Sequence, residues 1–380
     1  MTRMRTARKR ESRKMREILC MGASPGYAAR MLSHLCLRDF RPFASLDWQP
    51  RPDVNFILAP NATGKTSLLE AICFLLRLQS PRTSLPGECV RFGCPGFSVD
   101  GQWNDHRLRV KYEQRLKRFS LDSQPQSSAT EYLAVARVTW ISNDDLDLVR
   151  SGGSARRRFL DFLGAQAVPG YLRQLRAYER AVRARNSLLR DARPHREVAA
   201  FDGPLAAAGD FLIEVRAQMT AALEPCAAGF CRQISGTAER LSIAYRPGAP
   251  RPMAEALEAA REDDARLRMT TLGPHRDDLK LLLDEKPAGT FASEGQQRSI
   301  ALALKAAQAS ELSAQTGSHP LYLMDDIFGE LDAPRRNRLL EALPAAAQKI
   351  IATTSLDWLA GREPVGTVFH LHTDGSLTHG

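Results

Sequence analysis

The segment Ala59–Thr66 constrains the fold of this 380-residue chain more than any other part of the sequence. Its residues, Ala-Pro-Asn-Ala-Thr-Gly-Lys-Thr, follow an apolar strand-like run at Val54–Leu58 and precede an unbroken helical pattern at Ser67–Leu76. A strand, a glycine-bearing loop and a helix are the context of a phosphate loop, where backbone N–H groups and a helix N-terminus bind nucleotide phosphates. We therefore expect ATP to bind along this loop, at Ala59, Pro60, Asn61, Ala62, Thr63, Gly64, Lys65 and Thr66.

Two side chains of the loop are expected to do its chemistry. Lys65 would reach the β- and γ-phosphates as a catalytic residue, and Thr66 would supply a hydroxyl to Mg²⁺. Ala59 stands where the strict pattern has glycine, and a Cβ there costs about 1 kcal/mol if φ must be positive. A chance Gly-Lys-Thr at a helix start is the alternative, so the prediction needs further elements.

A second element is the apolar run Leu321–Met324, which ends in Asp325 and Asp326. This is the form of a Walker B strand, in which the first acid orders Mg²⁺ through water. Asp326, the second acid, is in the position that holds the attacking water in an ATPase. The alternative is a strand end capped by acids for solubility, but a Walker B strand must follow the phosphate loop, and this one does.

The third element is Ser293–Arg298, which leads into an apolar helical pattern. A serine followed by Gly-Gln at a helix start offers a hydroxyl, a backbone N–H and a dipole to an anion. An ordinary N-cap would need no ligand. Because this segment precedes the Asp-Asp strand by about 25 residues, the order matches ABC-type ATPases. In that class the serine reaches the nucleotide of a second subunit, so we expect Ser293, Gly295 and Gln296 to bind ATP in trans.

Other strand and helix patterns suggest how the chain is divided. Strand-like alternation occurs at 31–40, 97–101, 107–110 and 135–141, and apolar runs recur at 279–283 and 349–353. Between them, helical spacing dominates, and short buried runs separated by helices favour a largely parallel sheet. We predict an α/β fold, an ABC-type P-loop ATPase head domain split in sequence by a mainly helical arm. The predicted segments are 31–154 for the first half of the head, 155–265 for the arm and 266–380 for the second half.

The net charge of +10 is concentrated at the N-terminus, where residues 1–30 hold nine Lys or Arg against two acids. We interpret 1–30 either as a disordered basic tail or as translation from an upstream start, with Met31 the favoured original start. The seven cysteines are an odd number without zinc-ligand spacing, and with no secretory signal they indicate a reducing, cytoplasmic setting. No apolar run is long enough to span a membrane.

The expected arm is rich in arginine. Within one helical stretch we expect DNA phosphates to contact Arg173, Arg176, Arg180, Arg183 and Arg185. The alternative is a solvated helix face whose arginines are paired with acids. Only Glu179 and Asp191 are near enough for that, so such pairing would be incomplete.

Several stretches resemble the RecF family of bacterial DNA replication and repair proteins. The similar segments are Asn61–Thr66 with Leu69–Ile72, Arg156–Asp161, Tyr178–Leu189, Gly273–Leu279, Ser293–Arg298 and Asp325–Asp332. They extend over residues 31 to about 375. The chain departs from the family's usual residues at Ala59, at Asn143-Asp144, at Gly153 and at Gly329.

The resemblance implies an ATP- and Mg²⁺-dependent clamp on gapped, single- or double-stranded DNA, acting in gap repair and the SOS response. It also implies an ATP-dependent homodimer, slow DNA-stimulated hydrolysis that releases the clamp, and mediator partners, RecR and RecO, that help load RecA. Two alternatives stay open. One is a non-hydrolysing scaffold in which Ala59 and other departures have weakened the site and only protein partners matter. The other is an SMC-like head, although the arm shows no sustained heptads.

Overall fold

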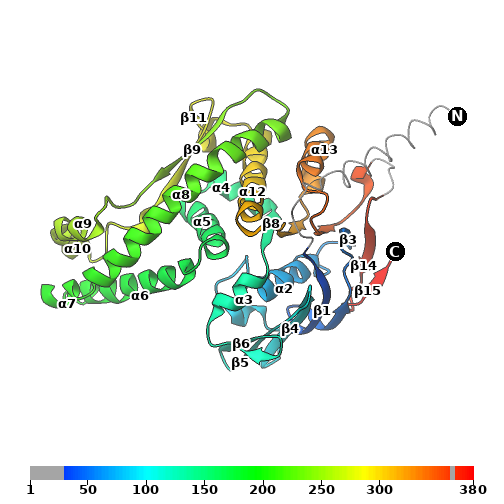
Figure 1. Ribbon diagram of the computed structural model, residues 1–380, viewed down its shortest axis with the longest axis horizontal. Coiled ribbons are helices and arrows are strands. Elements are labelled where there is room, and N and C mark those ends of the chain that lie inside the picture. The colour runs from blue at the N-terminus through cyan, green and yellow to red at the C-terminus, as the bar shows by residue number, and fades with distance from the viewer. Residues whose placement is uncertain (1–29, 360–363) are drawn as a thin grey trace. The chain divides into compact units, whose positions relative to one another are not determined.

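The computed structural model describes residues 30–359 and 364–380, so the predictions for residues 1–29 lie outside it. The chain divides into two compact units (Figure 1). The head unit holds the residues up to Asp145, Gln233–Gly236 and Gln308–Gly380, and the helical unit holds Leu146–Arg232 and Thr237–Ala307. This division differs from the sequence-based boundaries near residues 155 and 265, which stay a prediction about the arm.

One sheet of the head unit is largely parallel, as predicted. In spatial order its strands are β15 (Leu377–His379), β14 (Thr367–Leu371), β3 (Val54–Leu58), β13 (Lys349–Thr353), β12 (Leu321–Asp325) and β8 (Val138–Ser142). Only β15 pairs antiparallel, with β14. The first four residues of β3 and all five of β13 are buried, which explains their unbroken runs without polar alternation.

The second sheet of the head unit is antiparallel. Its order is β2 (Phe43–Trp48), β1 (Leu32–Phe40), β4 (Gly96–Trp103), β5 (His106–Glu113), β6 (Leu116–Leu121) and β7 (Gln124–Pro125). Strict alternation of burial along β4 gives the sheet one core face and one solvated face. The predicted strands at 31–40, 97–101 and 107–110 are confirmed. The strand predicted at 135–141 begins only at Val138, because Val135 ends helix α3 (Ala129–Val135).

Helix α2 (Lys65–Arg77) contacts strands of both sheets, which lie on either side of it (Figure 1). Every residue from Leu68 to Arg77 is buried, and ten consecutive residues point to all sides of a helix. A helix covered on all sides must be apolar all round, which is why Ser67–Leu76 shows no polar stripe. The remaining head elements are η1 (Pro86–Cys89), η4 (Phe328–Glu330), α13 (Ala333–Ala342) and η5 (Asp357–Leu359); η2 (Asn143–Leu146) ends at the unit boundary.

The helical unit is built mainly of helices. They are α4 (Asp147–Arg150), α5 (Gly153–Ala167), α6 (Tyr171–Arg190), α7 (His195–Ala199), α8 (Asp202–Ser235), α9 (Met253–Ala259), α10 (Arg261–Leu267), η3 (Pro274–Arg276), α11 (Ala288–Phe291) and α12 (Glu294–Thr316). Helices α8 and α12 contribute residues to both units. Over residues 30–359 and 364–380, no helix combines the length and apolar character that crossing a membrane requires.

The stretch 155–265 is mainly helical, as predicted, and it also contains strand β9 (Leu241–Arg246). One sequence-based expectation about this unit is wrong. The run at 279–283 does not belong to the parallel sheet. It forms β10 (Asp278–Leu283), which pairs antiparallel with β9 and with β11 (Lys286–Pro287) in a separate three-stranded sheet. A short apolar run gives no information about which sheet it joins.

Candidate nucleotide site

The phosphate loop lies between the end of β3 and the start of α2. Gly64 takes the left-handed conformation (φ 111°) at the helix N-cap, and no side chain caps the helix. A Cβ on Gly64 would lie 3.0 Å from Pro42 Cγ and 3.2 Å from a ring carbon of Phe43. Both the backbone angle and the space therefore require glycine, and the first N–H groups of α2 are left to bind an anion.

Ala59 does not strain the loop. The loop residues with positive φ are Ala62 (φ 63°) and Gly64, whereas Ala59 takes an ordinary negative φ. Its N–H donates to the carbonyl of Thr353 (3.3 Å), and its methyl group is buried in the core. The expected cost of about 1 kcal/mol for a positive φ at a non-glycine residue therefore does not arise here.

The predicted catalytic lysine is held at the loop. Lys65 Nζ donates to the carbonyl oxygens of Ala59 (2.7 Å) and Pro60 (2.8 Å), and the side chain is almost fully buried. Burial lowers the pKa of Lys65, and the negative charges of Asp326 and Asp325 oppose that shift. The amino group is thus placed among oxygen atoms and beside both acids.

Thr66 and Asp325 meet although 259 residues separate them in the sequence: Thr66 Oγ1 donates to Asp325 Oδ1 at 3.0 Å. Strand β12 lies next to β13 in the sheet, which brings its carboxyl end to the phosphate loop. Burial raises the pKa of Asp325, the hydrogen bond from Thr66 opposes that rise, and Asp326 adds to it. A hydroxyl and a carboxylate in contact are the kind of hard oxygen donors that Mg²⁺ prefers.

Asp326 has an unusual backbone conformation for a non-glycine residue, with φ 50°. Its N–H donates to the carbonyl of Ala352 (3.0 Å), and its own carbonyl accepts from Asn143 Nδ2 (3.3 Å). Strained angles of this kind persist where neighbours fix them, often at functional sites. Asn143 directly follows β8, and Asp326 directly follows β12. These two strands are parallel neighbours, so the residues after their carboxyl ends lie side by side. The sequence marks Asn143 only as a departure from the family pattern, but its place after a buried strand is a usable signal for a residue at this edge of the sheet.

A cluster around Glu70 was not predicted from the sequence. Glu70 lies on α2 one turn after Thr66 and is fully buried. Its carboxylate accepts hydrogen bonds from Arg41 (3.0 and 3.1 Å), Ser80 Oγ (2.6 Å) and Arg82 (3.3 Å). The charge of Arg82 also acts to lower the pKa of Asp325. Glu70 therefore fixes two arginine-bearing loops beside the nucleotide site.

We expect Glu70→Gln to lower the free energy of unfolding of the head unit by about 2 kcal/mol, the usual loss for hydrogen bonds to charged groups. The figure is modest because Arg41 and Arg82 are partly exposed and can turn to water. All four tryptophans lie in the head unit, so urea unfolding followed by tryptophan fluorescence measures it. The matched control is Glu88→Gln in η1 of the same unit, where the side chain is exposed and the expected loss is below about 0.5 kcal/mol.

Ser293, Gly295 and Gln296 lie at the start of α12, in the helical unit. Ser293 Oγ accepts from the N–H of Gln296 (3.3 Å), and Gln296 Oε1 accepts from the N–H of Ser293 (2.6 Å), which is a capping box. Gln296 Nε2 also donates to Glu239 (2.7 Å). Ser293 is exposed, so its hydroxyl caps the helix and still faces solvent.

Four of the five arginines predicted to contact DNA are exposed on α6: Arg173, Arg176, Arg180 and Arg183. Arg185 is a wrong prediction as a DNA contact, because its side chain is only 1% exposed. It is paired with Asp264 (2.6 Å) and Asp202 (2.9 Å) inside the helical unit. A guanidinium already paired with two carboxylates in the protein interior cannot reach a phosphate.

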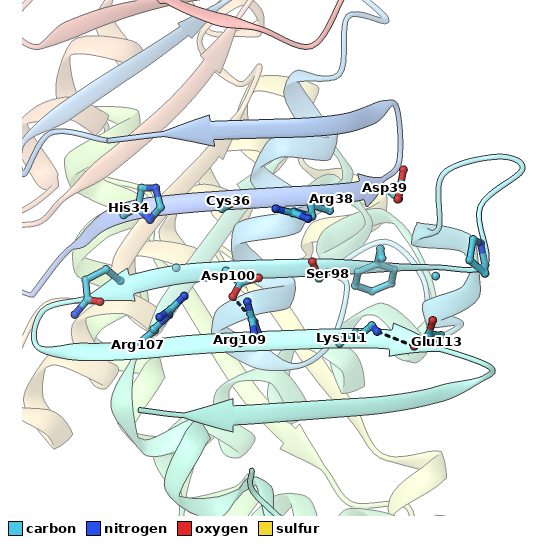
Figure 2. Close-up of a pocket in the computed structure, with 15 residues that line it drawn as sticks. His34, Cys36, Arg38, Asp39, Ser98, Asp100, Arg107, Arg109, Lys111 and Glu113 are labelled. Carbon is cyan, nitrogen blue, oxygen red and sulfur yellow. Dashed lines mark hydrogen bonds and ion pairs between the residues drawn. The ribbon is translucent and has the colours of Figure 1, made fainter. Parts of the chain in front are cut away.

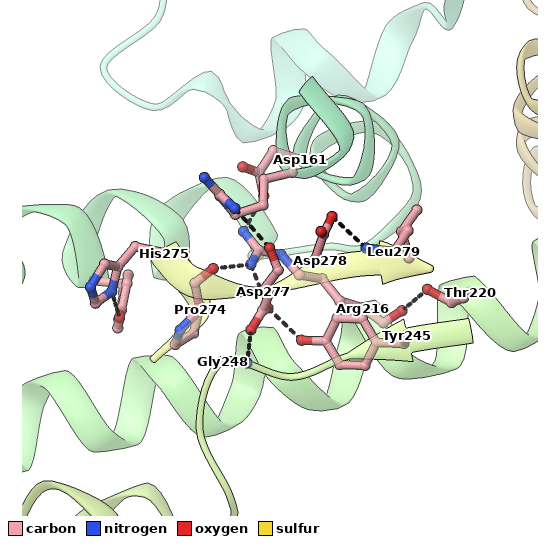
Figure 3. Close-up of polar contacts among 12 residues, drawn as sticks. Asp161, Arg216, Thr220, Tyr245, Gly248, Pro274, His275, Asp277, Asp278 and Leu279 are labelled. Carbon is pink, nitrogen blue, oxygen red and sulfur yellow. Dashed lines mark hydrogen bonds and ion pairs between the residues drawn. The ribbon is translucent and has the colours of Figure 1, made fainter. Parts of the chain in front are cut away.

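The family-like run Gly273–Leu279 forms a buried polar cluster (Figure 3). Asp277 is fully buried and accepts from Arg216 Nη1 (2.6 Å), from the N–H of Gly248 (2.7 Å) and from Tyr245. Arg216 also pairs with Asp161 at 2.7 Å. These contacts join α5, α8 and the strands β9 and β10, so the run stabilises the helical unit.

The two residues flanking Asp277 are held as well. Asp278 forms a two-point ion pair with Arg156 on α5 (2.6 and 3.0 Å). His275 Nε2 donates to the carbonyl of Thr270 (3.0 Å), so Nδ1 accepts from Tyr178 OH (2.6 Å). Burial lowers the pKa of His275, consistent with a neutral ring that fills both roles. All these side chains have structural partners within the helical unit.

A depression of about 740 Å³ lies on the outer face of the antiparallel sheet (Figure 2). Its charged side chains are largely paired, Arg109 with Asp100 and Lys111 with Glu113. None of the predicted nucleotide-site residues lines it. The depression is thus a solvated sheet face and is separate from the phosphate loop.

Comparison with known proteins gives three kinds of match. Residues 34–138 match the model of an AAA domain. The chain is 36% identical to the DNA replication and repair protein RecF of Moorella thermoacetica, over 88% of this chain and 92% of that protein. It is 39% identical to RecF of an Anaeromyxobacter species, over 85% of this chain and 92% of that protein.

Solved structures agree with these matches. The structure of the recombination mediator protein RecF with ATP, from the RecFOR pathway, has a TM-score of 0.84 and 27% identity, covering 94% of this chain and 99% of that chain. An Smc head bound to the C-terminal winged-helix domain of ScpA has a TM-score of 0.54 at 15% identity, covering 92% of this chain and 96% of that one. The second likeness concerns the fold alone.

Proposed function

The chain belongs to the RecF family of DNA replication and repair proteins, and from this membership we propose that it is an ATP-dependent clamp on DNA. It acts in gap repair and the SOS response, on chromosomal DNA in the cytoplasm. RecR- and RecO-type mediators are its partners, and together they help to load RecA. ATP hydrolysis is slow, is stimulated by DNA and serves as the switch that releases the clamp.

The observation that carries the ATPase proposal is the 3.0 Å contact between Thr66 on the phosphate loop and Asp325 at the end of β12. These oxygens fit Mg²⁺, which Thr66 and Asp325 would hold. When bound, Mg²⁺ neutralises charge on the β- and γ-phosphates. Lys65 leaves its loop carbonyls to bind the phosphates, and Asp326 orients the attacking water. The related RecF structure with ATP supports the choice of nucleotide.

Ser293, Gly295 and Gln296 complete the site from a second chain. The exposed hydroxyl of Ser293 and the N-terminus of α12 suit the γ-phosphate of the nucleotide held by the partner. Two copies then enclose two ATP molecules, so ATP drives formation of the homodimer. The alternative of a non-hydrolysing scaffold depended on Ala59 and other departures weakening the site. Against it, Ala59 takes an ordinary backbone conformation, and Lys65, Thr66, Asp325 and Asp326 are all present.

Helix α6 supplies the DNA contacts. Arg173, Arg176 and Arg180 have spacings of three and four residues, so they form one stripe, which Arg183 continues. In this stripe only Arg183 has an ion pair among the described residues, a 3.9 Å contact with Glu179. Exposed guanidinium groups along about three helical turns can bind several phosphates of gapped DNA.

We expect the double variant Arg176→Gln/Arg180→Gln to weaken DNA binding and to reduce the slope of log affinity against log salt by about 2. Each lost phosphate contact removes about 0.9 from that slope. Binding of a labelled gapped duplex, measured from low to physiological salt, gives the slope. The matched control is Arg266→Gln, an exposed arginine of the same unit outside the stripe. An unchanged slope in the double variant would remove α6 from the interface.

The whole proposal is tested by ATP turnover with and without gapped DNA, on chains that start at Met1 and at Met31. DNA should raise turnover several-fold in both chains, because the basic segment before Met31 contains none of the site residues. Turnover that is absent under both conditions would favour the scaffold alternative.

A further inference from the structure

An exposed aromatic side chain lies beside the predicted trans-acting serine. Phe291 ends α11, is 66% exposed and precedes Ser293 by two residues. Among the described residues it is one of six exposed large apolar side chains, and the one that adjoins a predicted nucleotide-site residue. Exposing the apolar ring of a phenylalanine to water is unfavourable, so a surface that covers Phe291 gains binding free energy.

The segment that carries Phe291 is held firmly. The buried side chain of Gln297 donates to the carbonyl of Ala292 (3.0 Å) and to that of Gly289 (3.4 Å). Gln297 Oε1 in turn accepts from Arg150 Nε (2.6 Å). Because the backbone on both sides of the ring is fixed, covering the ring costs little further ordering entropy.

Charged side chains follow Phe291 closely in the sequence. Glu294, three residues after it, pairs with Arg298 (3.0 Å) and lies 3.5 Å from Arg150. In a protein–protein hot spot, an aromatic centre is covered and a polar rim excludes water from it. An exposed ring next to charged residues is consistent with that composition.

We propose that Phe291 is the apolar anchor through which this chain binds a second copy of itself when ATP is bound. The inference rests on the proposed function, in which Ser293 reaches the nucleotide of the partner. Two residues of chain span at most about 7 Å, so a Ser293 at the partner's nucleotide brings the Phe291 ring to the partner's surface. That surface offers apolar atoms, since Pro42 and Pro60 are exposed next to the phosphate loop.

The test is sedimentation of the full chain with Mg²⁺ and a non-hydrolysable ATP analogue. Phe291→Ala should raise the dissociation constant of the dimer about 30-fold, as loss of a hot-spot aromatic does. Phe291→Tyr keeps the ring and should stay within about threefold of the native protein. Phe92→Ala removes a still more exposed ring from the head unit and should leave the constant unchanged.

Binding of a fluorescent ATP analogue to the monomer, at protein concentrations too low for dimers, should be the same in Phe291→Ala and the native chain. Weaker monomer binding would mean that Phe291 acts within its own chain and would overturn the inference. If Phe291→Ala dimerises as the native chain does, the inference fails and the proposed function stands. If the native chain forms no nucleotide-dependent dimer, both fail.

Discussion

Lys65→Arg is expected to lower ATP turnover by about 100- to 1000-fold, the range seen when a group that stabilises developing charge is removed. Lys65 is almost fully buried, and its Nζ lies 2.7 and 2.8 Å from two loop carbonyls. A planar guanidinium is larger than an ammonium group and cannot take the same place, although the charge is kept. ATP-dependent and DNA-stimulated dimerisation should be lost with turnover.

The fold should survive this change, because the tip of Lys65 contacts only the loop itself. Circular dichroism and the tryptophan-fluorescence unfolding curve should match those of the native chain. Lys111→Arg is the control, since Lys111 is half exposed on the antiparallel sheet and pairs only with Glu113. Native turnover in Lys65→Arg would refute the assignment of the phosphate loop.

The nucleotide site could largely be predicted because its parts are local in sequence. The strand, loop and helix around Lys65 are consecutive, and each has its own apolar spacing. The meeting of Thr66 with Asp325 follows from the order of elements, since parallel strands bring their carboxyl ends to one edge of a sheet. The cluster around Glu70 could not be predicted in the same way. Its partners Arg41 and Arg82 come from irregular loops, where no periodicity indicates which side chains will meet.

The misplacement of Arg185 has a different cause, because the sequence did hold the information. At about 100° per residue, Arg185 lies roughly opposite the stripe of Arg173, Arg176 and Arg180 on α6. It shares its side of the helix with the buried residues Tyr178 and Ala181. The number of arginines in the segment says nothing about this angle. Their positions around the helix place Arg185 on a different side from the stripe.

The exposed and buried arginines of α6 also show why charge alone does not define an interface. Asp264, the partner of Arg185, is 79 residues away in the sequence. Acids close to Arg185 in the sequence therefore give no indication of this pair. The same is true of Arg216 and Asp277, which are 61 residues apart. Long-range pairs of this kind decide whether a basic residue is a ligand contact or part of the core.

Arg216→Met is expected to lower the free energy of unfolding of the helical unit by about 3–5 kcal/mol, the usual cost of removing one partner from a buried ion pair. Arg216 is 2% exposed and pairs with two acids, and without it the fully buried Asp277 carboxyl group loses its cationic partner. Far-UV circular dichroism reports the helices, whereas tryptophan fluorescence reports the head unit. We expect the dichroism transition to move to lower denaturant and the fluorescence transition to move much less.

Two further variants separate lost packing from an orphaned charge. Arg232→Met, an exposed arginine on the same helix α8, should change stability by less than about 0.5 kcal/mol. Adding Asp277→Asn to Arg216→Met should recover at least half of the loss, because an amide in that place can still accept from Gly248 and carries no charge. If the double variant were as unstable as the single one, the loss would come from packing. In that case the ion pair between Asp277 and Arg216 would not be the interaction that holds the Gly273–Leu279 segment in place.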